Sequence, residues 1–446
     1  MMILGAWSLQ TNCTYAQDST QVLTLDDCIR IGLDQSTQIL LSKDSTRITG
    51  AALMGAYGNF LPNLALGGNY GYNNGRYLLT TTEPTLVKAA GSAMNYQLTT
   101  TVNIFNGLSD YSALKAATLS KSASQFNLQR AEQQITFDIT QTFLQIVLDR
   151  RVVQYGHDNV EASIKRQQQL EELTAVGRNA ISDLYQQQAE TSSDSLYLIQ
   201  AQDKLKNDII LLLRKIKITQ TNKYGIAEMT PDTLPLSAEY QNVQDLIAKA
   251  LDQRPDVKSS DLYVQMAGWQ VKGLKSGYLP KLNLTGGMVS ESGYLNELYI
   301  DGSNALGPQE SPGKALFGQL YGEIDLNLSW NIFDRLYTKT NVDIAKIYQQ
   351  NAVIIHDDLA VQVSADIKQA YNDYIAALQQ IQTANRGMFA ASQAFDVVQG
   401  RYDVGQATFV EVSNAQIVLL QAQVSKAQAD VNLNLQKKII DYYIGK

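Results

Sequence analysis

The sequence predicts an α+β membrane protein that combines long antiparallel coiled-coil helices with the strands of a transmembrane β-barrel. Three observations lead to this fold class. The chain contains an internal two-fold repeat, each copy holds a helical segment of 71 positions without proline, and each copy holds a hairpin in which apolar and polar residues alternate. Such an alternating strand suits lipid on one face and water on the other.

The repeat is visible in short motifs at which the backbone must turn. Four motifs recur in the same order: Leu33-Asp34-Gln35 and Leu251-Asp252-Gln253, Leu61-Pro62 and Leu279-Pro280, Asn103-Ile104-Phe105 and Asn331-Ile332-Phe333, Val176-Gly177 and Val404-Gly405. The numbering offset between copies is 218 for the first two pairs and 228 for the last two. Each copy must therefore present the same faces to equivalent neighbours, which disfavours an enzyme with one asymmetric pocket.

Composition narrows the class of protein further. The 446 residues are 45% hydrophobic and 18% charged, with a formal net charge of −7. This charge, without any basic block, disfavours a nucleic-acid partner. The longest aliphatic stretch, Ile209 to Leu213, is far shorter than the roughly 20 apolar residues of a membrane helix. A chain of this kind can cross a bilayer only as a β-barrel.

The predicted elements follow one another in two similar series. Residues 1–16 resemble a truncated signal peptide that ends at Thr14-Tyr15-Ala16, with Cys13 as an alternative lipoprotein cysteine. Repeat 1 covers 17–216, with a hairpin at about 61–106 and long helices at about 107–176 and 180–216. A connector follows over 217–240. Repeat 2 covers 241–446, with a hairpin at about 279–334 and long helices at about 335–403 and 408–443.

The hairpins are predicted from alternation. The alternating positions on the predicted apolar face in the two copies are Leu64, Leu66, Gly68, Tyr70, Tyr72, Tyr96, Leu98, Thr100, Val102, Ile104, Leu282, Leu284, Gly286, Met288, Ile324, Leu326, Leu328, Trp330 and Ile332. Taken alone, this pattern favours an ordinary half-exposed antiparallel sheet. The long helical segments that accompany both hairpins favour membrane strands instead. The segments 73–93 and 291–319 are rich in Gly, Ser, Thr and Asn, so we expect long loops there.

The long helices are predicted from heptad spacing. Ile367, Tyr371, Tyr374, Leu378 and Ile381 form a seam, and the offset of 228 places it on Ile139, Phe143, Ile146, Arg150 and Val153. A helix of this length extends roughly 100 Å. In the helices predicted at about 180–216 and 408–443 we expect one side to face water, formed by Gln187, Gln188, Gln416, Gln421 and Gln423.

The sequence offers no catalytic, cofactor or metal motif. Its two histidines, His157 and His356, stand outside any metal-binding or nucleophile pattern, and no Cys/His spacing suggests a zinc site. Adjacent acidic residues such as Glu171 and Glu172 lie on helical stretches, where neighbours point in different directions. We therefore predict a protein that is not an enzyme.

With these elements in place, the chain resembles the TolC-like outer-membrane efflux protein family. The resemblance rests on Gln253-Arg254-Pro255-Asp256-Val257, Gly277-Tyr278-Leu279-Pro280, Trp330-Asn331-Ile332-Phe333-Asp334 and Arg401-Tyr402-Asp403-Val404-Gly405. It implies a homotrimer in which each chain gives four strands to one barrel in outer-membrane lipid. It also implies a periplasmic helical tunnel that meets an adaptor protein and an inner-membrane pump of RND or ABC type, in a Gram-negative bacterium.

The resemblance also implies a gate at the periplasmic tips. The turns at Gly177 and Gly405 would contact the adaptor, and the constriction would be formed by Ser182, Asp183, Tyr402, Glu411 and Asn414. Tyr402 and Asp183 match the latch partners and Glu411 matches an acidic ring. Ala407 stands where the latch arginine is expected, and Asn414 replaces a second acidic residue. Asp183 and Glu411 are equally explained as helix N-terminal carboxylates.

Two functions from different classes follow. The first is the outer-membrane exit duct of a tripartite efflux or type I secretion system, which passes small molecules or polypeptides without consuming energy. The alternative is a periplasmic or surface coiled-coil scaffold without a pore. The scaffold predicts extraction without detergent, whereas the duct predicts a membrane fraction.

Overall fold

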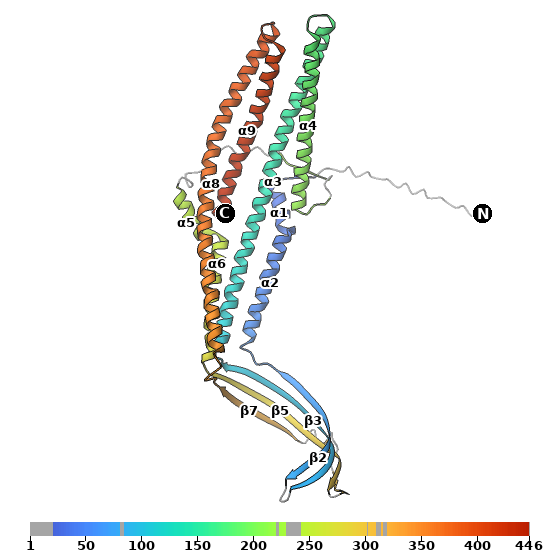
Figure 1. The fold of residues 1–446 in the computed structure, drawn as a ribbon, viewed down its shortest axis with the longest axis vertical. Helices are drawn as coiled ribbons and strands as arrows, with labels where there is room; N and C mark the ends of the chain where they lie inside the picture. Colours follow the sequence, from blue (N-terminus) through green and yellow to red (C-terminus); the bar gives the residue numbers. More distant parts are fainter. Residues whose placement is uncertain are drawn as a thin grey trace, which may run out of the picture. The chain divides into compact units, whose positions relative to one another are not determined.

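The computed structural model describes residues 21–80, 84–219, 223–228, 242–300, 302–308, 314 and 319–445. The expected signal peptide, Cys13 and most of the expected connector lie outside the described residues. The chain forms two compact units: unit 1 comprises Met1–Asp44, Asn127–Val257 and Leu359–Lys446, and unit 2 comprises Ser45–Phe126 and Lys258–Asp358. Figure 1 gives the labels of the helices and strands.

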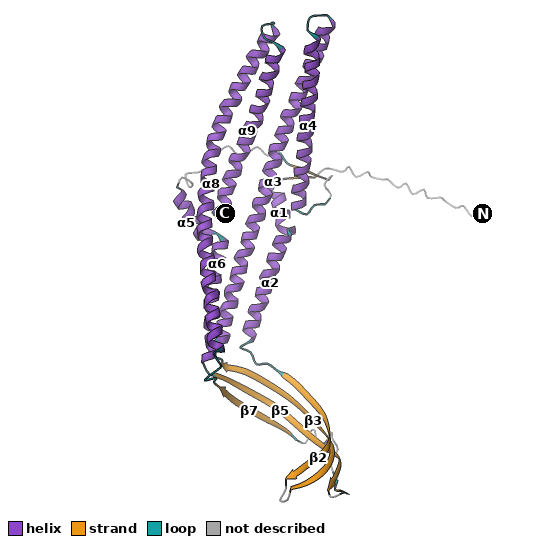
Figure 2. Ribbon diagram, in the orientation of Figure 1, coloured by secondary structure: helices purple, strands orange, loops and turns teal. Residues whose placement is uncertain are grey.

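The helices form two matching series (Figure 2). The first series is α1 (Leu25–Gln35), α2 (Thr37–Gly58), α3 (Ser109–Ala175) and α4 (Ile181–Lys215), and the second is α5 (Val243–Gln253), α6 (Pro255–Leu274), α8 (Tyr337–Asp403) and α9 (Phe409–Tyr443). Helices α3 and α8 each have 67 residues, and α4 and α9 each have 35. The bounds of α8 and α9 follow those of α3 and α4 at the same numbering offset of 228. In the described part of the chain, no helix combines the length and apolarity needed to cross a membrane.

The heptad positions form the cores of unit 1, as the spacing predicts. In the second series Ile367 and Tyr374 are buried, and Tyr371, Leu378 and Ile381 pack against them. Ile139, Phe143 and Ile146 are buried at the equivalent positions of the first series. The polar exception, Arg150, donates from Nη2 to the Ile226 carbonyl at 2.7 Å, so its charge is accommodated at the edge of the core.

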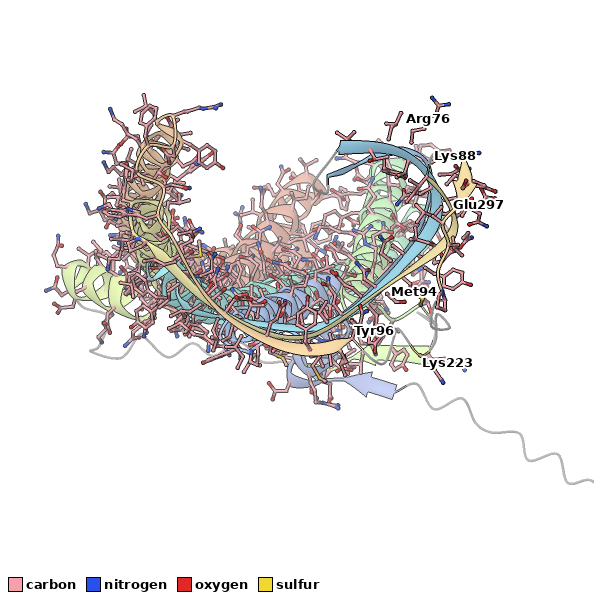
Figure 3. All side chains as sticks on the ribbon, turned by 90° about the horizontal axis from the view of Figure 1, so that it is seen from below. Arg76, Lys88, Met94, Tyr96, Lys223 and Glu297 are labelled. Carbon is pink, nitrogen blue, oxygen red and sulfur yellow. The ribbon has the colours of Figure 1, made fainter. Side chains whose placement is uncertain are left out.

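An antiparallel sheet of four long strands and one two-residue strand lies in unit 2. Its long strands are β2 (Ala65–Thr80), β3 (Pro84–Phe105), β5 (Lys281–Ile300) and β7 (Leu320–Ser329), paired in the order β2-β3-β5-β7. The two-residue strand β6 (Ser303–Asn304) also pairs with β5, and a small parallel pair joins β1 (Gln21–Leu23) to β4 (Tyr224–Ile226). Figure 3 shows the arc followed by β3 and β5, with Met94, Tyr96 and Glu297 labelled along it.

The strand register separates apolar from polar positions, as the alternation predicts. On one face, neighbouring strands form the rows Leu66–Leu98–Met288 and Val102–Leu284–Leu326. On the other face they form the rows Thr101–Thr285–Asp325 and Asn103–Asn283–Asn327. Several members of the apolar rows are exposed in the single chain: Leu66 is 77% exposed and Leu326 is 64% exposed.

The expectation of long loops is wrong over most of 73–93 and over 291–300. Strand β2 pairs with β3 without interruption from Ala65 opposite Thr99 to Thr80 opposite Pro84, and β5 continues to Ile300. Gly, Asn, Ser and Thr favour turns in isolation. Here continuous cross-strand hydrogen bonding outweighs that preference, because strand propensity depends on the neighbouring strand.

Candidate functional site

Both long helices of unit 1 end in the same glycine turn. Gly177 follows α3 with φ of +74° and Gly405 follows α8 with φ of +77°. In the first turn the Gly177 amide donates to the Thr174 carbonyl at 3.0 Å and the Arg178 amide donates to the Leu173 carbonyl at 2.8 Å. In the second turn the Gly405 amide donates to the Tyr402 carbonyl at 2.9 Å and the Gln406 amide donates to the Arg401 carbonyl at 2.7 Å. This is the Schellman C-cap, in which glycine takes the left-handed conformation without strain.

Glu411 caps the helix that follows the second turn. The Thr408 amide and hydroxyl donate to Glu411 Oε2 at 2.6 and 3.0 Å, and the Glu411 amide donates back to Thr408 Oγ1 at 3.3 Å. These bonds from Thr408, with a smaller effect of the Arg401 charge, hold the pKa of Glu411 below its ordinary 4.5. The helix-terminal role considered for this carboxylate is therefore present, and the group is ionised and exposed.

Asp183 occupies the matching position in the first turn of α4, but its surroundings differ. The N-cap there is Ala180, which makes no side-chain cap, and Ser182 Oγ donates to Asp183 Oδ1 at 3.3 Å. Because the α4 cap leaves Asp183 without a Thr partner, its carboxylate keeps acceptor capacity for other groups.

The five predicted gate residues are not joined into one site within a single chain. Tyr402 is half-buried, and Asn414 is exposed. Among the described residues, no hydrogen bond links the Tyr402 hydroxyl to Asp183. Arg401 is engaged in its own turn, where Nη2 donates to the Gln406 carbonyl at 2.8 Å. Their assignment to a gate stays a prediction.

A largely buried polar cluster, which no sequence pattern indicated, lies between α3, α4 and α9. Its members are Asn159, Ser163, Arg166, Gln187, Glu190, Asp194, Ser413 and Gln416. Gln187 is 0% exposed and its amide donates to Ser163 Oγ at 2.8 Å. Gln416 is 9% exposed. The expectation that the glutamines form a wet side is therefore wrong for these two, because each finds its partner on α3.

A second cluster gives a structural role to the motif Gln253-Arg254-Pro255-Asp256-Val257. Arg254, whose side chain is 5% exposed, donates from Nε and Nη2 to the two carboxylate oxygens of Asp256 at 3.0 and 2.6 Å. Arg130 of α3 lies 3.4 Å from the same carboxylate and 4.0 Å above the Tyr442 ring. We call Arg130, Arg254, Asp256 and Tyr442 the arginine–aspartate cluster; it ties the start of α6 and the end of α9 to α3.

Burial alone would raise the pKa of Asp256. The hydrogen bonds from Arg254 and the charges of Arg130 and Arg254 outweigh that effect, so its pKa lies below 3.8.

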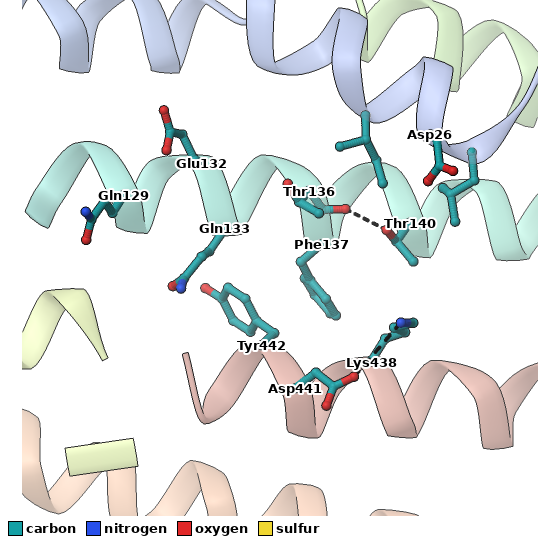
Figure 4. Close-up of a pocket in the computed structure, with 12 residues that line it drawn as sticks. Asp26, Gln129, Glu132, Gln133, Thr136, Phe137, Thr140, Lys438, Asp441 and Tyr442 are labelled. Atoms are coloured by element: carbon teal, nitrogen blue, oxygen red, sulfur yellow. Dashed lines mark hydrogen bonds and ion pairs between the residues drawn. The ribbon is translucent and has the colours of Figure 1, made fainter. Parts of the chain in front are cut away.

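A cavity of about 640 Å³ opens beside this cluster between α1, α3 and α9 (Figure 4). Asp26, Glu132 and Asp441 contribute carboxylates to its lining, with Lys438 the basic group and the stacked Phe137–Tyr442 pair the aromatic wall. Within the described ranges, His, Cys, Asp and Glu side chains form no group that could hold a metal ion.

The comparisons with known proteins agree with this architecture. The sequence model of the family described as "Outer membrane efflux protein" matches residues 246–440. The outer membrane protein TolC of Salmonella enteritidis is 22% identical over 399 residues, which cover 86% of this chain and 74% of that protein.

Two solved structures share the fold. The outer membrane protein VceC of Vibrio cholerae has a TM-score of 0.80 at 16% identity, covering 94% of this chain and 96% of VceC. The Campylobacter jejuni CmeC outer membrane channel has a TM-score of 0.76 at 18% identity, covering 94% of this chain and 85% of CmeC. Residues 246–440 of the chain thus match the outer membrane efflux protein family, and the chain as a whole shares the fold of VceC and CmeC.

Proposed function

We propose that this protein is the outer-membrane exit duct of a tripartite efflux or type I secretion system. The observation that carries the proposal is the register of the four-stranded sheet. It places the apolar rows Leu66–Leu98–Met288 and Val102–Leu284–Leu326 on one face and the polar rows Thr101–Thr285–Asp325 and Asn103–Asn283–Asn327 on the other. One face fits lipid and the other fits a water-filled lumen. Strand β7 has 10 residues, about the length that crosses the hydrocarbon core.

The sheet also explains why the protein acts as a homotrimer. In the described sheet, β2 pairs only with β3 and β7 pairs only with β5, so both outer edges are open. Open edges cannot lie in lipid, because their backbone groups would have no hydrogen-bond partner. Pairing of β7 from one chain with β2 of the next removes every edge when three chains close into one barrel.

The long helices form the periplasmic part of the duct, and its tips form the gate. The turns at Gly177 and Gly405 contact a periplasmic adaptor that connects the duct to an inner-membrane pump. Tyr402 and Asp183 latch neighbouring tips across the trimer, which agrees with the unused acceptor capacity of Asp183. The ionised Glu411 repeats three times around the axis and favours cations over anions.

Planar-bilayer recording of the detergent-purified protein tests this function. We expect small conductance steps and reversal potentials that indicate cation preference. Tyr402→Phe combined with Asp183→Ala should enlarge the steps, because the latch loses both partners. The matched control is Tyr348→Phe with Asp203→Ala, which changes exposed residues of the same types away from the tips.

The outcomes separate the proposals. Current in wild type that the latch variant leaves unchanged would remove Tyr402 and Asp183 from the gate but keep the duct. Verified insertion without any current, in wild type and both variants, would refute the duct and favour the scaffold alternative.

A further inference from the structure

The apolar face of the sheet changes its chemistry along the strands, from the ends near α2 and α3 toward the β2–β3 turn. Near the helices it carries the row Leu66–Leu98–Met288. Rows that carry tyrosines follow, Tyr70–Met94–Ser292 and Tyr72–Ser92–Tyr294. The face then becomes polar in the row Asn74–Ala90–Glu297 and cationic in the row Arg76–Lys88–Tyr299. The order apolar, aromatic and charged is the order of a barrel wall that passes from hydrocarbon into lipid headgroups.

A β-bulge keeps the last two rows on this face. The β3–β5 register shifts between Ala90 and Gly91, where β5 has one residue more than β3. An extra residue reverses the alternation beyond it. Tyr294 before the bulge and Glu297 after it therefore lie on the same face. Figure 3 shows Arg76, Lys88 and Glu297 on the convex side of the arc.

The cationic row lies at the depth of lipid headgroups. Arg76 follows Leu66 by ten residues on β2. At about 3.4 Å per residue and a tilt of about 45°, this separation spans about 24 Å across a membrane. The lipid-facing apolar band of an outer-membrane barrel is about 25 Å tall. With Leu66 at one boundary of the band, Arg76 and Lys88 lie at the other.

The two cations line a cavity of about 400 Å³ on the sheet. Its other lining residues are Leu86, Val87, Tyr299 and Gly302. Arg76 and Lys88 are exposed, and Lys88 Nζ lies 6.0 Å from the centre of the Tyr299 ring. In the part of the chain that the structure describes, no carboxylate forms an ion pair with either cation. Both therefore keep their donors for an acceptor outside the chain.

We infer that Arg76 and Lys88 bind the phosphate-bearing headgroup of an anionic lipid in the outer leaflet. This inference rests on the membrane placement of the sheet in the proposed function. The Arg76 guanidinium matches two phosphate oxygens at once, and the Lys88 ammonium adds a compact charge. A lipid fits better than a free anion, because the same face continues from the cations into the apolar rows that acyl chains would cover.

Native mass spectrometry of the purified full-length protein in detergent tests the site. The probe is diphosphorylated lipid A, and phosphatidylcholine is the zwitterionic reference lipid. Arg76→Gln combined with Lys88→Gln should weaken lipid A binding about 30-fold, and Lys88→Gln alone about five-fold, because each cation near an anionic lipid contributes a similar free energy. The matched control, Arg386→Gln with Lys368→Gln, removes the same charges from exposed positions of α8 and should bind as wild type.

Glu297→Gln is a second variant with the opposite expectation. Its carboxylate lies in the row next to the cations and repels phosphate. Its removal should strengthen lipid A binding up to about five-fold. Because this change removes a repulsion, its readout does not depend on how the sheet tolerates the loss of Arg76 and Lys88.

Three results would overturn the headgroup site. They are equal lipid A binding by wild type and the double variant, equal binding of lipid A and phosphatidylcholine by wild type, and full displacement of lipid A by the same concentration of inorganic phosphate. In the last case the cations would hold the free anion. Planar-bilayer recording separates this inference from the duct. Current in wild type without a lipid A preference would remove the site and keep the duct. A lipid A preference that the double variant loses, without current from any inserted protein, would refute the duct and keep the site.

Discussion

Removal of the Asp256 charge should destabilise unit 1 more than any exposed charge change. In Asp256→Asn, Arg254 and Arg130 lose the carboxylate that they share at 2.6 and 3.4 Å. The Arg254 side chain is 5% exposed, so its charge would remain buried and uncompensated. Breaking one side of a buried ion pair costs about 3–5 kcal/mol. Because Asp256 itself is 23% exposed, we expect about 3 kcal/mol, near the lower limit.

The assay is denaturant unfolding of the purified protein in detergent, followed by helical circular dichroism. The matched control is Glu161→Gln in the Lys165–Glu161 pair, whose side chains are 69% and 55% exposed. An exposed pair contributes about 0.5 kcal/mol or less. If Asp256→Asn lowers the unfolding free energy by no more than Glu161→Gln does, the arginine–aspartate cluster is not the tie that its geometry indicates.

The same cluster predicts a pH dependence. Asp256 has a folded-state pKa below its ordinary 3.8, so its stabilising contribution is complete above that value. The contribution is lost as pH falls through the lower folded-state pKa. The unfolding free energy of wild type should therefore fall more steeply below about pH 4 than that of Asp256→Asn. Parallel profiles for the two proteins would contradict the assigned shift.

Three further predictions follow from single positions. Gly405→Ala should lower the unfolding free energy by about 1–2 kcal/mol, because φ is +77° there. Its control is Gly387→Ala, in an open position within α8, which should raise the unfolding free energy by about 0.5–1 kcal/mol in the same denaturation assay. The Cys28 thiol is buried, and burial raises its pKa to about 11; mass spectrometry should find it unalkylated by iodoacetamide at pH 8 until the protein is unfolded. Ile324→Lys, on the apolar face of the sheet, should reduce the fraction that folds into lipid vesicles at a cost of about 2–4 kcal/mol, whereas Asn327→Lys on the polar face should not.

A local sequence pattern was sufficient to predict those elements in which the same kind of contact recurs at regular intervals along the chain. Heptad spacing located the buried Ile367 and Tyr374, since a coiled-coil seam is specified by the sequence of each helix alone. Alternation likewise gave the apolar face that includes Leu66 and Leu326, because side chains in a strand change face at every residue. The turn preference of polar residues failed over 73–93, since pairing with a partner strand decides whether such residues extend a strand.

The candidate site divides in the same way. The glycine turns at Gly177 and Gly405 were legible in the sequence, because a left-handed residue after a long helix favours glycine. The polar cluster between α3, α4 and α9 could not be predicted from the sequence, since its members Arg166 and Gln416 are 250 residues apart in the chain. One signal was available: comparison of the two copies at the offset of 228 shows polar residues in the first where the second has Gly387, Ala394 and Val418.

The sequence by itself determined the fold class, the long helices, the alternating strands and the resemblance to a family of outer-membrane channels. These follow from the heptad spacing of the helices and the strict alternation of the strands, which each segment carries independently of the rest of the chain. Only the tertiary structure decided which polar residues are buried and which partners they have. Burial of Gln187 and Gln416, and the sharing of Asp256 by two arginines, depend on helices from distant parts of the chain meeting at one level. That meeting is a property of the packed structure, because no local pattern records which side chains will face each other.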